Sequence, residues 1–185
     1  RPSLDWDSLP REIRRTGRRR GGVRQRNRRR RFKPVLPSVI MGNVQSLSNK
    51  IDELHACVEH QRDFRQASMF CFTETWLTEK EPSSKIDVDG FSCIRRDRDC
   101  AVTGKSKGGG VCVYVNENWC HPGHVHVKES FCSPDVELLS LSLRPYYLPR
   151  EFSHVIVTVV YIHPAANQKA AEDTVHTTIA NLQAS

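Results

Sequence analysis

The sequence lacks any long apolar run. Its 185 residues contain no uninterrupted apolar stretch approaching the roughly 18 residues of a membrane-spanning helix. The start of the chain also lacks the basic, apolar and small-residue zones that make up a secretory signal peptide. Neither a transmembrane helix nor a signal peptide is therefore expected within these residues. We therefore expect a soluble, intracellular protein with no membrane partner.

The cysteines lack the spacing of a redox or disulfide motif. There are seven, and no two of them form a C-x-x-C pair. Several stand in apolar runs, as Cys71 and Cys112 do, where a free thiol behaves as a small hydrophobe. This pattern favours a reducing compartment over a disulfide framework. Residues 120–126 hold one thiol and three imidazoles, but no second ligand pair accompanies them, so we expect no zinc site.

Acidic side chains are scarce in one segment only. Residues 11–33 hold 13 basic and one acidic side chain, whereas residues 34–185 hold 14 basic and 18 acidic ones. The net charge of +7 therefore combines a basic arm with a mildly acidic body. The arm is also too poor in large apolar residues to offset the entropy cost of ordering it. We predict a disordered Arg-rich arm over residues 1–34 and a folded domain over residues 35–185.

The arm is predicted to bind nucleic acid, and its basic clusters are also typical of a nuclear-import signal. Guanidinium groups that neutralise phosphates release counterions, so such binding is non-specific and depends steeply on salt. We expect a nuclear protein that also occurs in the cytoplasm. A solvated tail is the alternative interpretation. The predicted contact residues are Arg18, Arg19, Arg20, Arg28, Arg29, Arg30 and Arg31.

The apolar pattern predicts an α/β or α+β sheet protein. The expected strands are 36–43, 68–73, 91–94, 111–115, 136–143 and 154–161. Helical spacing predicts helices over 47–64 and 167–183, and polar composition predicts loops over 78–90 and 97–107. The segment 154–161 is nearly continuous β-branched sequence, which favours a buried central strand.

Two of the expected strands end at side chains that suit a metal ion. Asn43 ends the first strand and Glu74 follows the second, with one helical segment between them. An α/β sheet brings two such residues to the same carboxyl edge. A carboxylate beside a carboxamide offers the oxygen ligands that Mg²⁺ prefers, so phosphate-ester chemistry is the first hypothesis. The structural alternative is that Asn43 caps a turn and Glu74 begins a loop.

Several motifs occur in order over residues 36–185. They are Gly42-Asn43-Val44-Gln45-Ser46-Leu47, Asn49-Lys50-Ile51-Asp52-Glu53-Leu54, Thr73-Glu74-Thr75-Trp76-Leu77, Arg95–Arg98, Gly108–Val115, Glu137-Leu138-Leu139 and Val159–Pro164. Together they resemble the endonuclease/exonuclease/phosphatase superfamily and, more narrowly, the apurinic-type endonuclease domain of non-LTR (LINE-type) retrotransposon polyproteins. The resemblance implies a four-layered α/β sandwich of two packed β-sheets flanked by helices.

The resemblance also implies roles for individual residues. Glu74 matches the Mg²⁺-binding carboxylate, with Mn²⁺ as the alternative ion, and Asn43 matches the amide that organises metal and scissile phosphate. Tyr161 matches the tyrosine whose hydroxyl contacts the phosphate, although a core aromatic is the plain alternative. The loop that carries Arg98 would approach DNA, or it is simply a solvated charged loop. DNA is the expected partner, with the element's RNA as a second one.

The chain departs from the family pattern after Pro164. Family members continue with Gly-Asp-Phe-Asn, a further Asp and a Ser-Asp-His-type ending, which supply the water-activating Asp and the phosphate-supporting His. None of these motifs is present, and His154 and His163 stand at the wrong place in the order. We therefore expect a domain truncated at its C-terminus, with an exposed sheet edge.

The predicted function is the N-terminal part of a Mg²⁺-dependent DNA endonuclease domain. The complete enzyme would nick target DNA to prime reverse transcription, and this chain is not expected to cleave DNA by itself, because the members of such a site act as a unit. Two alternatives stay open. One is a non-enzymatic nucleic-acid-binding protein with an Arg-rich arm, and the other is a superfamily phosphoesterase that acts on phosphoinositides or nucleotides.

If the chain is the non-enzymatic nucleic-acid-binding protein, removal of residues 1–34 is expected to abolish the binding of duplex DNA, because the remaining body carries more acidic than basic side chains. For the whole chain, a plot of log affinity against log salt should have a slope of about −0.9 for each phosphate contacted. Fluorescence anisotropy with a labelled duplex at several salt concentrations measures both quantities. On this alternative Glu74→Ala should leave the binding unchanged, and binding that survives removal of the arm would contradict the alternative.

Overall fold

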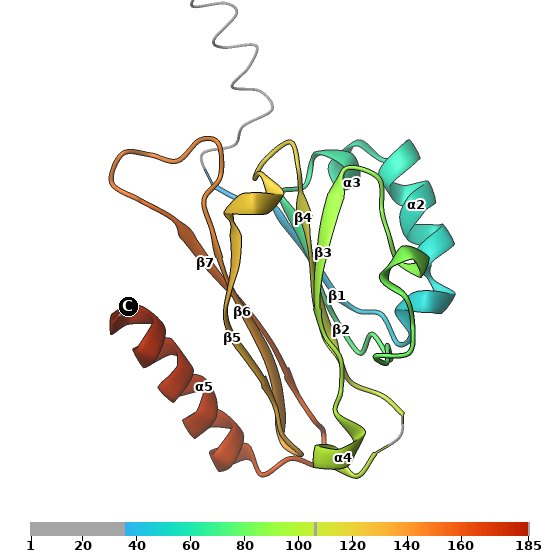
Figure 1. Ribbon diagram of the computed structural model, residues 1–185, viewed down its shortest axis with the longest axis vertical. Coiled ribbons are helices and arrows are strands. Elements are labelled where there is room, and N and C mark those ends of the chain that lie inside the picture. The colour runs from blue at the N-terminus through green and yellow to red at the C-terminus, as the bar shows by residue number, and fades with distance from the viewer. Residues whose placement is uncertain (1–35, 106, 185) are drawn as a thin grey trace, which may run out of the picture. The chain divides into compact units, whose positions relative to one another are not determined.

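The computed structural model describes residues 36–105 and 107–184 (Figure 1). The predicted arm, residues 1–34, lies outside these ranges. Its predicted contacts, Arg18, Arg19, Arg20, Arg28, Arg29, Arg30 and Arg31, lie outside them as well. Of the helices in the described ranges, none is long and apolar enough to cross a membrane.

Two β-sheets form the described body. The four-stranded sheet has the order β1-β2-β4-β3, and its strands are β1 (Val39–Asn43), β2 (Met69–Thr73), β3 (Phe91–Arg96) and β4 (Val111–Asn116). The three-stranded sheet has the order β5-β6-β7, with strands β5 (Val125–Cys132), β6 (Val136–Leu143) and β7 (Val155–Ile162). Strand β1 runs parallel to β2, whereas the other neighbouring strands pair antiparallel.

Helices cover the outer faces of both sheets (Figure 1). The helices are α2 (Ile51–His60), α3 (Arg62–Gln66), α4 (Cys100–Thr103) and α5 (Gln168–Ala184). Short 3₁₀ turns occur at Leu47–Asn49, Ser83–Lys85 and Pro122–His124. Helices α2 and α3 lie on the four-stranded sheet, and α5 lies along the three-stranded sheet (Figure 1). This order of helix, sheet, sheet and helix confirms the predicted α+β sandwich.

Apolar side chains of β2 and β4 point alternately to the two faces of the four-stranded sheet, so a core forms on each face. Successive side chains of a strand point to opposite faces. Phe70 and Tyr114 therefore join the cluster that also holds Leu54 of α2. Met69 and Val113 point the other way and pack against β6 and β7 of the other sheet. The two sheets are thus joined by apolar burial along their length.

The prediction of a buried central strand at 154–161 is wrong for the described residues. Strand β7 pairs only with β6, and most of its side chains are half-buried. Strand β6 is the central strand, and all eight of its residues are buried. The apolar run in β7 arises because its inner side chains, Val155, Val157, Val159 and Tyr161, pack against the core between the sheets.

Two other elements differ from the prediction. Strand β5 was not expected, because its register shifts between Val127 and Glu129 and the shift interrupts the alternating pattern. The helix expected over 47–64 is divided into three parts. A 3₁₀ turn precedes α2, and the extended backbone of Gln61 separates α2 from α3.

Tyr114→Phe is expected to destabilise the fold by about 1–2 kcal/mol, since it leaves the Ile86 carbonyl without its buried donor. Tyr114 is fully buried and its hydroxyl donates to the Ile86 carbonyl at 2.6 Å. Burial raises the pKa of Tyr114, so the phenol stays protonated. Urea unfolding measures the loss.

Ser153→Ala is the comparison variant, because it removes an exposed hydroxyl that contacts His154 Nδ1. It should cost much less stability than Tyr114→Phe. If both variants lose the same free energy of unfolding, the buried Tyr114 hydrogen bond contributes no more stability than the exposed contact of Ser153.

Candidate functional site

The ends of β1 and β2 place Asn43 and Glu74 on adjacent strands. Asn43 pairs in register with Thr73, the residue before Glu74. Beyond the strands the pairing continues, because Val44 N donates to the Thr73 carbonyl at 3.0 Å and Ser46 N donates to the Glu74 carbonyl at 2.9 Å. The predicted meeting of the two residues at one sheet edge therefore agrees with the backbone geometry.

The Glu74 carboxylate is held at one oxygen. Its Oε2 accepts hydrogen bonds from Trp76 Nε1 and, at 3.0 Å, from the backbone N–H of Gly109. Its Oε1 forms no hydrogen bond with another described residue. Both Glu74 and Trp76 have a left-handed backbone, each with φ of 57°, which costs free energy in residues with a side chain. The site thus holds a half-buried carboxylate in a fixed orientation with one oxygen open.

Asn43 is exposed and turns its carboxamide back on its own chain. Its Oδ1 accepts from the backbone N–H of Gln45 at 3.3 Å. This is the turn-capping role expected for a structural Asn. The amide nitrogen has no partner among residues that the structure describes, so the side chain can still donate to a ligand.

The glycine segment Gly108–Gly110 packs directly against this edge. Thr75 N donates to the Gly110 carbonyl, and Trp76 N donates to the Gly109 carbonyl. Gly109 has φ of 68°, and a Cβ there would lie 2.2 Å from Arg98 Nη2. A Cβ at Gly110 would lie 2.3 Å from Thr75 Oγ1. These contacts require glycine, because any side chain would displace the neighbouring groups.

A buried ion pair between Arg98 and Glu137 forms the wall beside the glycine segment. Arg98 Nε donates to Glu137 Oε1, and the backbone N–H of Gly110 donates to Glu137 Oε2. The two side chains are only 7% and 2% exposed. No role was predicted for Glu137, although it belongs to the motif Glu137-Leu138-Leu139. The available signal was a charged residue next to the start of an otherwise apolar strand.

Tyr161 lies next to this ion pair. It pairs in register with Glu137, and its ring centroid is 5.9 Å from the Arg98 guanidinium carbon. The ring packs against the core between the sheets, while the hydroxyl forms no hydrogen bond with another described residue. Glu74 and Tyr161 are therefore connected through Gly109 and Arg98. The predicted DNA contact of Arg98 stays a prediction, since its guanidinium is engaged with Glu137.

Two lysine side chains, Lys105 and Lys107, lie near Trp76 and Arg98. Lys107 Nζ lies 4.8 Å from the Trp76 ring centroid, and Lys105 Nζ lies 2.7 Å from His163 Nε2. Both lysines line a cleft of about 50 Å³ together with Trp76 and Arg98. The positive side chains give this edge of the molecule a potential that attracts anions.

Few described side chains at this edge could bind a metal ion. Over residues 36–105 and 107–184, no group of three or more His, Cys, Asp and Glu side chains is arranged to hold a metal ion. The open oxygen of Glu74 and the Asn43 carboxamide are the hard oxygen ligands that the ends of β1 and β2 supply. Such a pair suits an ion that keeps several waters and also binds a substrate phosphate, as Mg²⁺ does.

The sequence matches no known family model and no curated protein. The fold is similar to AP endonuclease LMAP from Leishmania major, with a TM-score of 0.51 and 19% identity over 68% of this chain and 40% of that one. It is also similar to the human Nocturnin catalytic domain with bound sulfate anion, with a TM-score of 0.50 and 11% identity over 79% of this chain and 58% of that one.

The described body shares its two-sheet sandwich fold with both structures. The chain spans 40% and 58% of their lengths. At these identities the similarity establishes the fold alone.

Gly109→Ala is expected to destabilise the fold by about 2–4 kcal/mol, from the left-handed backbone and from collision with Arg98. Gly90→Ala is the matched control, because Gly90 has φ of 78° and open space around its Cβ position. It should cost only about 1 kcal/mol, from the backbone alone. Urea unfolding of both variants measures the difference.

A double variant separates the two causes. In an Arg98→Ala background the collision disappears, so the additional cost of Gly109→Ala should fall to that of Gly90→Ala. If the cost of Gly109→Ala is the same with and without Arg98, the proposed contact is not responsible.

Proposed function

We propose that this chain forms part of the catalytic face of a metal-dependent phosphodiesterase that acts on nucleic acid. The specific proposal is an endonuclease of the retrotransposon type, which nicks target DNA and so supplies a 3′-hydroxyl for reverse transcription. The observation that carries it is the fixed Glu74 carboxylate, with one open oxygen, at a strand end adjacent to the one that carries Asn43. The basic arm supports nuclear location and nucleic acid as the substrate class.

The residues present fit one Mg²⁺ ion, with Mn²⁺ as the alternative. Glu74 would supply the carboxylate oxygen, and Asn43 would supply or orient a neutral ligand. When bound, the ion would polarise a phosphoryl oxygen and so stabilise charge that develops in the transition state. Trp76 and Gly109 would keep the carboxylate in one orientation, which avoids the cost of ordering it on binding.

Tyr161 has the role of a phosphate contact in this proposal. Its hydroxyl is free of other described partners, and the packing of its ring beside Arg98 limits its movement. A phenol in that position can donate a hydrogen bond to a phosphoryl oxygen. Lys105 and Lys107 would attract the phosphate backbone of a strand to the same edge.

No described residue is placed to act as the general base that would activate a water molecule. Glu137 accepts hydrogen bonds from Arg98 and from the backbone N–H of Gly110, and His163 contacts Lys105. A site with a metal ligand and a phosphate contact but no general base should hydrolyse phosphodiesters much more slowly than a complete site. We therefore expect this polypeptide alone to bind metal and DNA with little hydrolysis.

Glu74→Gln is expected to weaken Mn²⁺ binding by about tenfold or more, because it replaces the charged ligand with a neutral amide. Electron paramagnetic resonance of free Mn²⁺ measures the affinity. Glu59→Gln removes the same charge from an exposed position on α2 and should leave the affinity unchanged. Equal affinities in the wild type, Glu74→Gln and Glu59→Gln would refute the metal site.

Nicking of supercoiled plasmid in Mg²⁺ tests the reaction itself. Trace nicking that Glu74→Gln removes and Glu59→Gln retains would support the endonuclease. Nicking that is insensitive to Glu74→Gln would count against it. DNA binding through the arm without any metal binding at Glu74 would favour the non-enzymatic binding protein.

A further inference from the structure

The three-stranded sheet has an end that is remote from the candidate site. Strand β6 begins beside the ion pair of Arg98 and Glu137, and its other end lies about 20 Å further along the strand. The turn that leads into β5 and the loop between β6 and β7 lie at this far end (residues 119–128 and 144–154), opposite α4 (Figure 1). A ligand bound there would therefore occupy a different place from one bound at Glu74.

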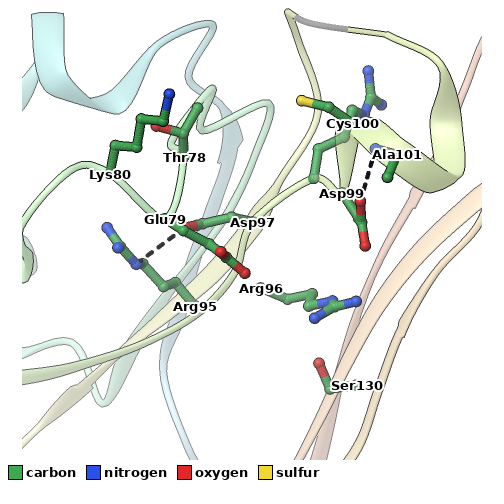
Figure 2. A pocket seen from close by; sticks show the side chains of 11 residues that line it. Thr78, Glu79, Lys80, Arg95, Arg96, Asp97, Asp99, Cys100, Ala101 and Ser130 are labelled. Atoms are coloured by element: carbon green, nitrogen blue, oxygen red, sulfur yellow. Dashed lines mark hydrogen bonds and ion pairs between the residues drawn. The ribbon is translucent and has the colours of Figure 1, made fainter.

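Most charged side chains in the cavity beside α4 already have partners. Figure 2 shows this cavity, in which Arg95 Nε lies 3.4 Å from Asp97 Oδ2. Asp99 Oδ1 accepts from the backbone N–H of Ala101 at 2.8 Å, and Arg98 is engaged in its ion pair. The polar atoms of the cavity wall that have no partner are buried, so a ligand in the cavity cannot reach them. The cavity therefore offers few free groups to a ligand.

Arg144 stands between two histidines at the far end. Its backbone N–H donates to the His124 carbonyl at 3.1 Å, so the pairing of β5 with β6 continues one residue beyond the strand end. Residues paired in this way point their side chains to the same face of a sheet. On the other side, His154 occupies the position next to Arg144, because Val155 pairs with Leu143. The arginine and both histidines are exposed.

The guanidinium of Arg144 is available to an anion. None of the ion pairs between residues that the structure describes involves it. The far end holds three basic side chains and one acidic, Glu151, whereas residues 34–185 together hold more acidic than basic ones. Glu117, just before the far end, accepts a hydrogen bond from Ser92 Oγ at 2.8 Å. The far end is therefore a basic patch on a mildly acidic body, and it attracts anions.

Exposed aromatic rings accompany these basic side chains. Phe152 is 60% exposed and Tyr146 is 49% exposed, although phenylalanine is among the residues most often buried. Tyr146 N donates to the Trp119 carbonyl at 3.1 Å, which joins the loop to the turn before β5. In that turn the rings of His121 and His124 lie 5.6 Å apart. Basic groups among exposed rings are typical of surfaces that bind single-stranded nucleic acid, because unpaired bases stack on such rings.

We propose that the far end of the three-stranded sheet binds single-stranded nucleic acid. Arg144 would donate charge-assisted hydrogen bonds to a phosphate, and Phe152 and Tyr146 would stack on unpaired bases. A duplex cannot use the rings in this way, because its bases are already stacked on one another. The strand segment held here is separate from one at the Glu74 edge, so this surface goes beyond the proposed endonuclease activity and does not depend on it.

Binding of the full chain to a short labelled oligothymidylate, compared with a duplex of the same length and without divalent metal, tests this proposal. The predicted contacts of the basic arm are with phosphates, so its contribution falls steeply with salt. The far end would contact fewer phosphates, so single-strand binding should persist at salt concentrations that abolish duplex binding. In an ¹⁵N-labelled sample, the backbone amides of residues 144–154 should then shift with the strand, which locates it without any substitution.

Phe152→Leu should weaken the binding of oligothymidylate by about tenfold, which corresponds to the loss of one base stacked on a ring. Phe152→Tyr keeps an aromatic ring and should bind as the wild type does. Arg144→Gln should also weaken the binding, whereas Arg62→Gln, which changes an exposed arginine on α3, should not. Glu74→Gln should leave this binding unchanged, so failure of the metal site and failure of this surface can be distinguished.

Three results would overturn the proposal. The first is equal affinity of the wild type, Phe152→Leu and Arg144→Gln for the single strand, with no shift of the amides of residues 144–154. The second is a loss of affinity in Phe152→Leu that Phe152→Tyr shares, since the aromatic ring would then not be the group that binds. The third is equal binding of polyglutamate and oligothymidylate, which would mean that the far end attracts acidic chains in general.

Discussion

The buried ion pair between Arg98 and Glu137 is the contact on which the arrangement of the site depends. Arg98 follows β3 of one sheet, and Glu137 lies at the start of β6 of the other, so the pair joins the sheets where their polar ends meet. A buried ion pair stabilises a fold only when its remaining polar atoms are also hydrogen-bonded. Gly110 meets this condition by donating its N–H to the second Glu137 oxygen.

The orientation of Glu74 follows from this ion pair through the glycine segment. Arg98 and Glu137 hold Gly109 and Gly110 in place, and the N–H of Gly109 then fixes one oxygen of Glu74. The left-handed backbone at Glu74 is compensated by hydrogen bonds from both neighbouring segments. As a result, a single carboxylate is oriented in advance. That geometry is suited to an ion whose other ligands are water and phosphate.

The sequence alone predicted the main layers and the two strand ends, but not the contacts that connect them. Asn43 and Glu74 could be recognised because each ends or follows an apolar strand, and strand ends are set by local composition. Strand β5 was missed because a bulge changes the phase of its side chains. The placement of β7 was wrong because β-branched residues indicate burial of a face without indicating the position of a strand in its sheet.

The sequence by itself determined the alternation that gives β2 and β4 two apolar faces, because a period of two residues is a local property of an extended chain. It also determined that Asn43 and Glu74 reach one edge, since a single helical segment separates two parallel neighbours. Only the tertiary structure decided that Glu137 pairs with Arg98 and that Tyr161 lies beside them. These contacts join residues 24 to 63 positions apart, and no local pattern specifies which charges will meet when two sheets pack.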